Sequence, residues 1–182
     1  CIGLALGLTA CMANSNPKGD PRRDLVIFAA ASLTDSFTEL ATVFEAQNPG
    51  INLVLHFASS AQLAAQLNEG VSADIFASAN QHQMQAAIDS QRVERMDVQF
   101  FAANTLTIVV PVGNPAGIHS LYDLGGTGVT LLLAVPGVPV RDYGDQILAN
   151  LPSSVQDSIY QNLISEESNV RQVATKVALG EA

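Results

Sequence analysis

Short apolar runs alternate with amphipathic stretches from residue 25 onward, which is typical of an α/β protein with a mainly parallel sheet. Unbroken apolar runs predict buried strands, whereas apolar residues three and four apart predict helices. Strands are expected at residues 25–30, 51–57, 73–78, 105–111 and 129–135. Helices are expected at residues 33–47, 61–68, 81–89, 120–124, 142–150, 154–163 and 170–179. The weakly charged stretch around residues 101–104 is the expected crossing between two lobes.

The first 23 residues differ in character from the rest of the chain. Residues 1–10 form an apolar run with the length of a signal-peptide core, well short of the roughly 20 residues of a membrane-spanning helix. The segment Leu8-Thr9-Ala10-Cys11 resembles the cleavage site of bacterial lipoproteins, whose cysteine is acylated. Residues 11–23 are polar and linker-like. We therefore expect a signal-peptide remnant that has lost its basic leader, then a linker anchored through Cys11 to the outer face of the cell membrane or in the periplasm. A buried N-terminal element with an incidental cysteine is the alternative.

Composition narrows the possible partners. The 182 residues include 8 Lys and Arg against 17 Asp and Glu, for a net charge of −9. Only 14% of residues are charged, against about 25% in an average soluble protein, and 48% are hydrophobic, which argues against disorder. No basic cluster of the kind that binds nucleic acid is present in the sequence. The two cysteines are too few for a zinc site.

Two junctions between a strand and a helix repeat one design. Residues 28–32 (FAAAS) and 57–60 (FASS) each end a predicted strand in small residues and serine. Ligands bind at the carboxyl ends of parallel strands, and the following helix N-terminus offers unpaired N–H groups to an anion. Ser32 and Ser60 are therefore candidate anion ligands. The alternative is that both merely cap their helices, with Asp35 completing a capping box after Ser32.

The chain resembles the molybdate-binding proteins of ABC importers, a branch of the periplasmic-type binding proteins. The matching segments occur in the family's order and are residues 26–36 (VIFAAASLTDS), 57–63 (FASSAQL), 73–79 (ADIFASA), 104–111 (NTLTIVVP), 138–143 (VPVRDY) and 169–180 (NVRQVATKVALG). The resemblance implies a two-lobed periplasmic-binding-protein type II fold, with mainly parallel sheets flanked by helices and the ligand in the cleft between lobes. The lobes would be residues 24–103 and 104–182, the second incomplete because the family's return to the first lobe is missing.

The resemblance also implies a function and a ligand set. The protein would capture molybdate, or tungstate, for a membrane permease, as a monomer without cofactor or catalysis. Ser32 and Ser60 match the two serine ligands, and Val140 and Val170 match two positions that give a backbone N–H from the second lobe; no side chain would ligate the metal directly. Independently, Ser168-Asn169 looks like a helix N-cap just before Val170. The family's tyrosine ligand lies beyond Ala182, and Tyr122, Tyr143 and Tyr160 do not match its position.

A negative net charge gives an anion no long-range attraction, so binding would depend on local dipoles and hydrogen bonds. Arg141 replaces the family's usual glycine. It is expected to face solvent and to pair with Asp142 or Asp145; the alternative is that it reaches the anion and broadens selectivity. Other cargo, such as sulfate or a small organic anion, is the alternative within the binding class. An α/β hydrolase using Ser32 or Ser60, and the sensing domain of a transcription regulator, are alternatives of other classes.

Overall fold

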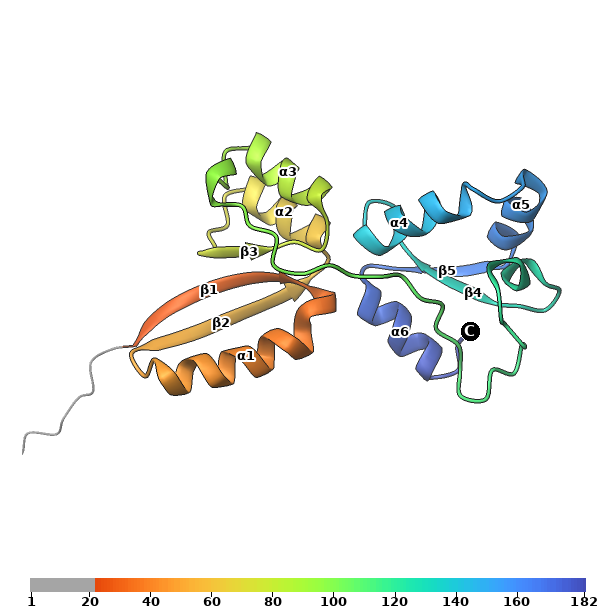
Figure 1. The fold of residues 1–182 in the computed structure, drawn as a ribbon, viewed down its shortest axis with the longest axis horizontal. Coiled ribbons are helices and arrows are strands. Elements are labelled where there is room, and N and C mark those ends of the chain that lie inside the picture. Colours follow the sequence, from red (N-terminus) through yellow and green to blue (C-terminus); the bar gives the residue numbers. More distant parts are fainter. Residues whose placement is uncertain (1–21) are drawn as a thin grey trace, which may run out of the picture.

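Two parallel sheets, each flanked by its own helices, lie at opposite ends of an elongated molecule (Figure 1). This computed structural model describes residues 22–182. The expected signal-peptide remnant, Cys11 and all but the last two residues of the expected linker lie outside the described residues. The described chain contains no helix long and apolar enough to span a bilayer.

The first lobe is built from three strands and three α-helices. In chain order these are β1 (Arg23–Ala30), α1 (Thr34–Gln47), β2 (Ile51–Ala58), α2 (Ser60–Asn68), β3 (Ile75–Ala77) and α3 (Gln81–Asp89), with a short 3-10 turn, η1 (Ala31–Leu33), between β1 and α1. The strand order is β2-β1-β3, and both pairings are parallel. Because Ala30 pairs with Ala58, the segments that follow β1 and β2 leave the sheet at the same edge.

Helices cover both faces of this sheet. Phe28 on β1 packs with Leu63 and Leu67 of α2, and Ala87 of α3 completes that cluster. The opposite face carries Ile27, Ala29 and Ala77, against which Leu33 and Phe37 pack. Figure 1 shows α1 on one side of the sheet and α2 with α3 on the other. Alternate residues of β1 thus face two separate apolar clusters, as its unbroken apolar run predicts.

The second lobe holds a two-stranded sheet. Its elements are the 3-10 turn η3 (Leu121–Gly125), β4 (Leu131–Ala134), α4 (Pro139–Leu148), α5 (Ser153–Gln161), β5 (Leu163–Glu167) and α6 (Val170–Ala178). The strands β4 and β5 are parallel. The buried residues Leu124, Leu148 and Ile159 form the core cluster. In Figure 1, α4 and α6 lie on opposite sides of the sheet.

The strand expected at residues 105–111 is wrong. This segment crosses from the first lobe to the second, and none of the backbone groups of residues 105–110 makes a backbone hydrogen bond within the described chain. Its apolar character gives it β propensity, but a strand exists only where a neighbour pairs with it. Ile108 and Val109 are consequently exposed.

The strand β5 was not expected from the sequence. Its residues LISEE place Ser165 and Glu167 toward the protein, where Glu167 is buried and bonded to Lys176 of α6. Because these two inward-facing residues are polar, the segment lacks the alternation of apolar and polar residues that predicts a strand. The expected helix at 120–124 is only the 3-10 turn η3, and the helix expected from 142 begins earlier, at Pro139. The other expected helices and strands are confirmed within a few residues.

Candidate functional site

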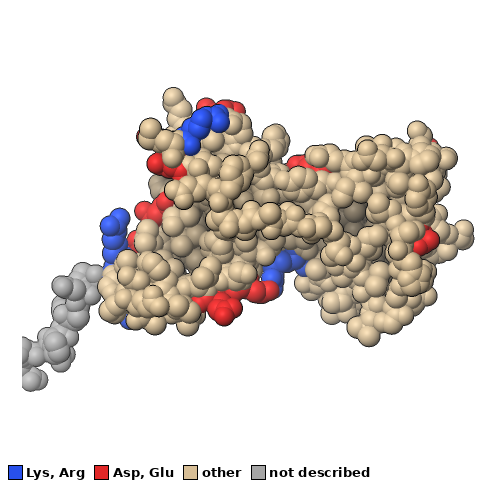
Figure 2. Space-filling view, in the orientation of Figure 1, with Lys and Arg blue, Asp and Glu red and all other residues tan. Residues whose placement is uncertain are grey.

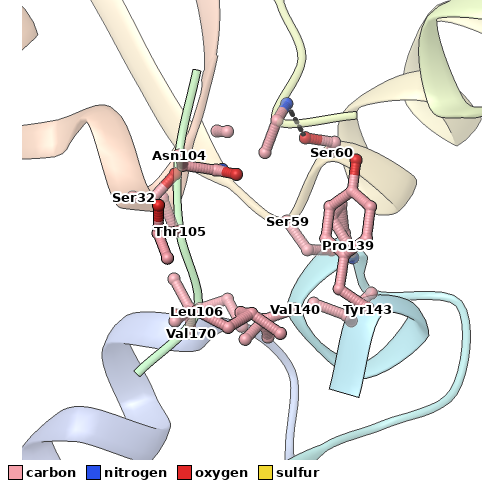
Figure 3. A pocket seen from close by; sticks show the side chains of 15 residues that line it. Ser32, Ser59, Ser60, Asn104, Thr105, Leu106, Pro139, Val140, Tyr143 and Val170 are labelled. Atoms are coloured by element: carbon pink, nitrogen blue, oxygen red, sulfur yellow. Dashed lines mark hydrogen bonds between the residues drawn. The ribbon is translucent and has the colours of Figure 1, made fainter. Parts of the chain in front are cut away.

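A cavity of about 160 Å³ collects residues from both lobes and from the crossing segment (Figure 3). All 15 lining residues are uncharged. The first lobe contributes Ala30, Ala31, Ser32, Ser59, Ser60 and Ala79. The second lobe contributes Val138, Pro139, Val140, Tyr143, Asn169 and Val170, and the crossing adds Asn104, Thr105 and Leu106. The four residues that the sequence singles out, Ser32, Ser60, Val140 and Val170, therefore meet in one cavity.

Ser59 and Ser60 are adjacent in the chain but are held differently. Ser59 is the N-cap of α2: its Oγ accepts the Gln62 N–H at 3.2 Å, and its own N–H donates to Gln62 Oε1. Ser60 is the first helical residue, and its Oγ accepts the Ala79 N–H at 2.9 Å (Figure 3). The alternative in which Ser60 merely caps its helix is therefore wrong. An amide that donates to Ser60 Oγ leaves the hydroxyl proton free for another acceptor.

Ser32 does not cap a helix either. It lies inside η1, and neither η1 nor α1 has a side-chain cap. Its hydroxyl is exposed at the cavity and makes no hydrogen bond within the described chain. Asp35, expected to complete a capping box, instead pairs with Arg171 of α6. The hydroxyl of Ser32 is therefore available to a ligand.

The second lobe presents two helix N-termini to the cavity. Pro139 occupies the first helical position of α4, so Val140 lies in its first turn. Asn169 caps α6 by accepting the Gln172 N–H at 3.1 Å, which confirms the N-cap expected before Val170. The first N–H groups of a helix have no partner inside it and lie at the positive end of its dipole. Val140 and Val170 therefore line the cavity from helix turns whose N–H groups have no partner within the helix, and no charged side chain lines this cavity.

Several lining residues lie in the segments that resemble the family, but the sequence does not single them out as site residues. Ala79 comes near because β3 pairs with β1, and it orients Ser60 through its backbone N–H. Asn104 and Thr105 line the cavity because the crossing segment passes between the lobes. Tyr143 follows Val140 by three residues and so shares its helix face. The expected helix, 142–150, does not include Val140, so the sequence does not place Val140 and Tyr143 on one helix face.

Arg141 is directed away from the cavity. Its guanidinium donates to Asp145, to the Ala134 carbonyl at 3.0 Å and to Glu166. Burial opposes its charge, but the hydrogen bonds that it donates to Glu166 and Asp145 outweigh that effect and raise its pKa. The pairing with Asp145 is confirmed, whereas the expected solvent-facing position is wrong because only 11% of the side chain is exposed. Arg141 joins the start of α4 to β4 and β5 and does not line the cavity.

Two interactions join the lobes on either side of the cavity. Gln83 Nε2 of α3 donates to the Gly137 carbonyl at 3.2 Å, just before α4. Arg171 Nη1 of α6 lies 2.9 Å from Asp35 Oδ2 of α1. The hydrogen bond from Arg171, and then its charge, lower the pKa of Asp35. Figure 2 shows a mostly uncharged face on which basic and acidic side chains meet near the junction of the lobes.

The comparisons with known proteins agree with this architecture. A profile described as bacterial extracellular solute-binding protein matches residues 25–182. The chain therefore belongs to this family of solute-binding proteins. Within it, the molybdate-binding protein ModA of Mycobacterium tuberculosis H37Rv is 38% identical over 186 residues, which cover 98% of this chain and 68% of the relative.

Two solved structures share the fold. The periplasmic molybdate-binding protein of Azotobacter vinelandii matches with a TM-score of 0.64 and 20% identity, over 87% of this chain and 68% of that one. The sulfate-binding protein SubI of Mycobacterium tuberculosis matches with a TM-score of 0.63 and 18% identity, over 85% of this chain and 60% of that one. The expected α/β class and type II binding-protein fold are confirmed.

Proposed function

We propose that this protein is the substrate-binding component of an ABC importer and captures molybdate or tungstate in the cavity between its lobes. One observation carries the proposal: helix N-termini from both lobes and serine hydroxyls from the first lobe meet in a cavity lined only by uncharged residues. Such a cavity suits a tetrahedral dianion held by neutral donors. The 38% identity to a molybdate-binding protein over nearly the whole chain supports this cargo.

The proposed ligands divide between the lobes. Ser32 and Ser60 give hydroxyl and backbone donors from the first lobe, and Val140 and Val170 give backbone N–H donors from the second. The lobes are residues 24–103 and 104–182. Closure of one lobe on the other would complete the donor set, after which the closed form would dock on a membrane permease. No cofactor and no covalent chemistry are needed for this cycle, which a monomer can perform.

The donor set favours fully deprotonated oxyanions. Backbone N–H groups can only donate, so the OH of a protonated anion would face donors and lose a hydrogen bond. Phosphate, which is partly protonated at neutral pH, should therefore bind weakly. Molybdate and tungstate have the same charge and nearly the same size, so this donor set does not distinguish them.

Sulfate is the second candidate cargo. It is also a tetrahedral dianion without a proton at neutral pH, and the fold is shared with a sulfate-binding protein. The fit of the anion to the cavity would then decide between sulfate and molybdate, since sulfate is the smaller of the two. A hydrolase is less well supported, because a nucleophilic serine needs a base that accepts its proton. The hydrogen bond to Ser60 Oγ comes from a backbone N–H, which cannot act as that base.

Export and anchoring complete the proposal. Membership in a family of extracellular solute-binding proteins is consistent with acylation of Cys11 and tethering to the membrane. A stable tether of this kind requires more than one acyl chain. In cells, Cys11→Ala should move the protein from the membrane fraction to the soluble fraction, whereas an unchanged distribution would contradict anchoring through Cys11.

Thermal unfolding of the purified protein with molybdate, tungstate, sulfate or phosphate at equal ionic strength tests the cargo. A specific ligand at 100 times its Kd should add about 2.7 kcal/mol to the free energy of unfolding. For a chain of this size the melting temperature should rise by roughly 5–10 °C. A rise with molybdate and tungstate alone supports the proposal. A larger rise with sulfate would favour the second candidate, and no rise with any of the four would overturn both.

A further inference from the structure

The three tyrosines of this chain have different surroundings. Tyr160 donates its hydroxyl proton to Asp145 Oδ1 at 2.8 Å, inside the second lobe. Tyr122 is 58% exposed on the surface. Tyr143 alone lines the cavity between the lobes, and its hydroxyl makes no hydrogen bond within the described chain. A polar group in that position is available to a ligand.

Helix geometry sets the direction of Tyr143. Val140 and Tyr143 lie three residues apart on α4, so they share the face that lines the cavity. In Figure 3 the hydroxyl end of the Tyr143 ring points toward the end of the cavity that Ser60 occupies. The helix start is fixed by Pro139 and by the network of Arg141, so the ring projects from a rigid element. Its hydroxyl thus faces the first-lobe donors across the cavity.

We propose that the Tyr143 hydroxyl donates a hydrogen bond to the bound oxyanion and is a specificity-determining side chain of the second lobe. This inference rests on the proposed function and extends its ligand set, in which Val140 and Val170 are proposed as backbone donors. A hydrogen bond from a hydroxyl to a charged acceptor is stronger than one between neutral groups. Since the ring is stiff and its helix is anchored, the distance from α4 to the oxyanion is fixed by the length of the side chain. The hydroxyl therefore selects for an oxyanion large enough to reach it, and molybdate and tungstate are larger than sulfate.

The test uses Tyr143→Phe, which removes the hydroxyl and keeps the ring. Isothermal titration with molybdate should show affinity weakened about ten- to a hundredfold, the loss typical of a hydrogen bond to a charged group. The preference for molybdate over sulfate should fall with it. Tyr122→Phe and Tyr160→Phe are matched controls and should bind as the wild type does. Melting temperatures without ligand should stay unchanged in Tyr143→Phe, because its hydroxyl has no partner in the protein.

A second readout follows from composition. The chain has no tryptophan and three tyrosines, so its intrinsic fluorescence comes from tyrosine. Molybdate should change this fluorescence in the wild type, in Tyr122→Phe and in Tyr160→Phe, but not in Tyr143→Phe at saturating ligand. If Tyr143→Phe binds molybdate and sulfate as the wild type does while Ser60→Ala is weakened, the inference is wrong and the proposed function stands. If the wild type binds none of the oxyanions, the proposed function itself fails.

Discussion

The ion pair between Arg171 Nη1 and Asp35 Oδ2, 2.9 Å long, joins the first turn of α6 to the first turn of α1 across the two lobes. Both residues are neighbours of proposed ligands: Arg171 follows Val170, and Asp35 lies three residues after Ser32. The pair therefore holds together the two segments whose donors face the same oxyanion. It also keeps the arginine charge outside the cavity, which has no charged lining.

Removing this pair should weaken cargo binding modestly. In Arg171→Gln the lobes lose one interlobe attraction, and since both partners are exposed the affinity for molybdate should fall roughly two- to fivefold at low salt. The difference from the wild type should shrink in 0.5 M salt, which screens exposed charges. Titration calorimetry at the two salt concentrations measures both effects. Arg92→Gln, which removes a first-lobe arginine away from the cavity, is the control, and a salt-independent loss would argue against an electrostatic contact.

Replacing Ser59 by alanine should mainly affect stability, whereas replacing Ser60 should mainly affect ligand binding. Ser59→Ala removes the N-cap of α2 and should lower the free energy of unfolding by about 1 kcal/mol, or roughly 2–4 °C in melting temperature. Ser60→Ala should instead cost about 1.5–3 kcal/mol of binding free energy, because a hydrogen bond to a charged ligand is lost. Urea unfolding without ligand and calorimetry with molybdate separate the two. Wild-type affinity in Ser60→Ala would mean that Ser60 is not a ligand.

The sequence predicts the meeting of Ser32 and Ser60 for a physical reason. Parallel strands bring their carboxyl ends to one edge, and the small residues after 25–30 and 51–57 mark where the chain leaves the sheet. Which serine caps α2 cannot be inferred in this way, because Ser59 and Ser60 have the same side chain. The backbone decides it: Ser59 is extended, with φ −64° and ψ 147°, and places its Oγ over the Gln62 N–H.

The strands of the second lobe are harder to predict from the sequence than those of the first. Residues 105–111 have the composition of a buried strand, but their pairing depends on partners that local pattern does not specify. In β5 the composition is not that of a buried strand, yet a strand forms, because the charge of the inward Glu167 is compensated by Lys176, nine residues away on α6. The alternation of apolar and polar residues that predicts a strand does not reveal an inward charged residue whose partner lies on another element. Tyr143 and Ala79 line the cavity because of the geometry of α4 and β3, which the sequence pattern alone does not give.

Arg141 should matter for stability and leave selectivity unchanged. Arg141→Met keeps an extended apolar side chain and removes the hydrogen bonds to Asp145, Glu166 and Ala134. The expected loss is about 1–2 kcal/mol in the free energy of unfolding, at the lower end for charged groups because Asp145 and Glu166 are more than one-third exposed. The ratio of affinities for molybdate and sulfate should be that of the wild type. A changed ratio would show that the guanidinium reaches the anion.

The pair of Glu167 and Lys176 should make stability depend on acidity. Glu167 is 8% exposed at the end of β5, lies 2.7 Å from Lys176 Nζ and accepts the Ser165 hydroxyl proton at 2.6 Å. The hydrogen bond from Lys176, followed by that from Ser165, holds the pKa of Glu167 below its ordinary value of 4.5. The same pair raises the pKa of Lys176.

The directions of the pKa shifts of Glu167 and Lys176 define the pH range in which the pair stabilises the fold. A carboxyl with a depressed pKa in the folded state contributes stability that is complete above its unfolded pKa and is lost as the pH falls through the folded pKa. The raised pKa of Lys176 contributes stability that is complete below its unfolded pKa and is lost as the pH rises through the folded pKa. The pair therefore makes its full contribution to the free energy of unfolding at neutral pH. On the acid side this contribution is lost below about pH 4.5.

Glu167→Gln tests this directly by urea unfolding from pH 7 to pH 3. The variant should be less stable than the wild type at pH 7, because Lys176 loses its charged partner. The gap in the free energy of unfolding should close as the pH falls below about 4.5, where the wild-type carboxyl takes up its proton. Glu39→Gln, an exposed carboxyl on α1, is the matched control and should leave the acid limb of the wild type unaltered. A gap that stays constant down to pH 3 would show that Glu167 stabilises the lobe by shape and not by charge.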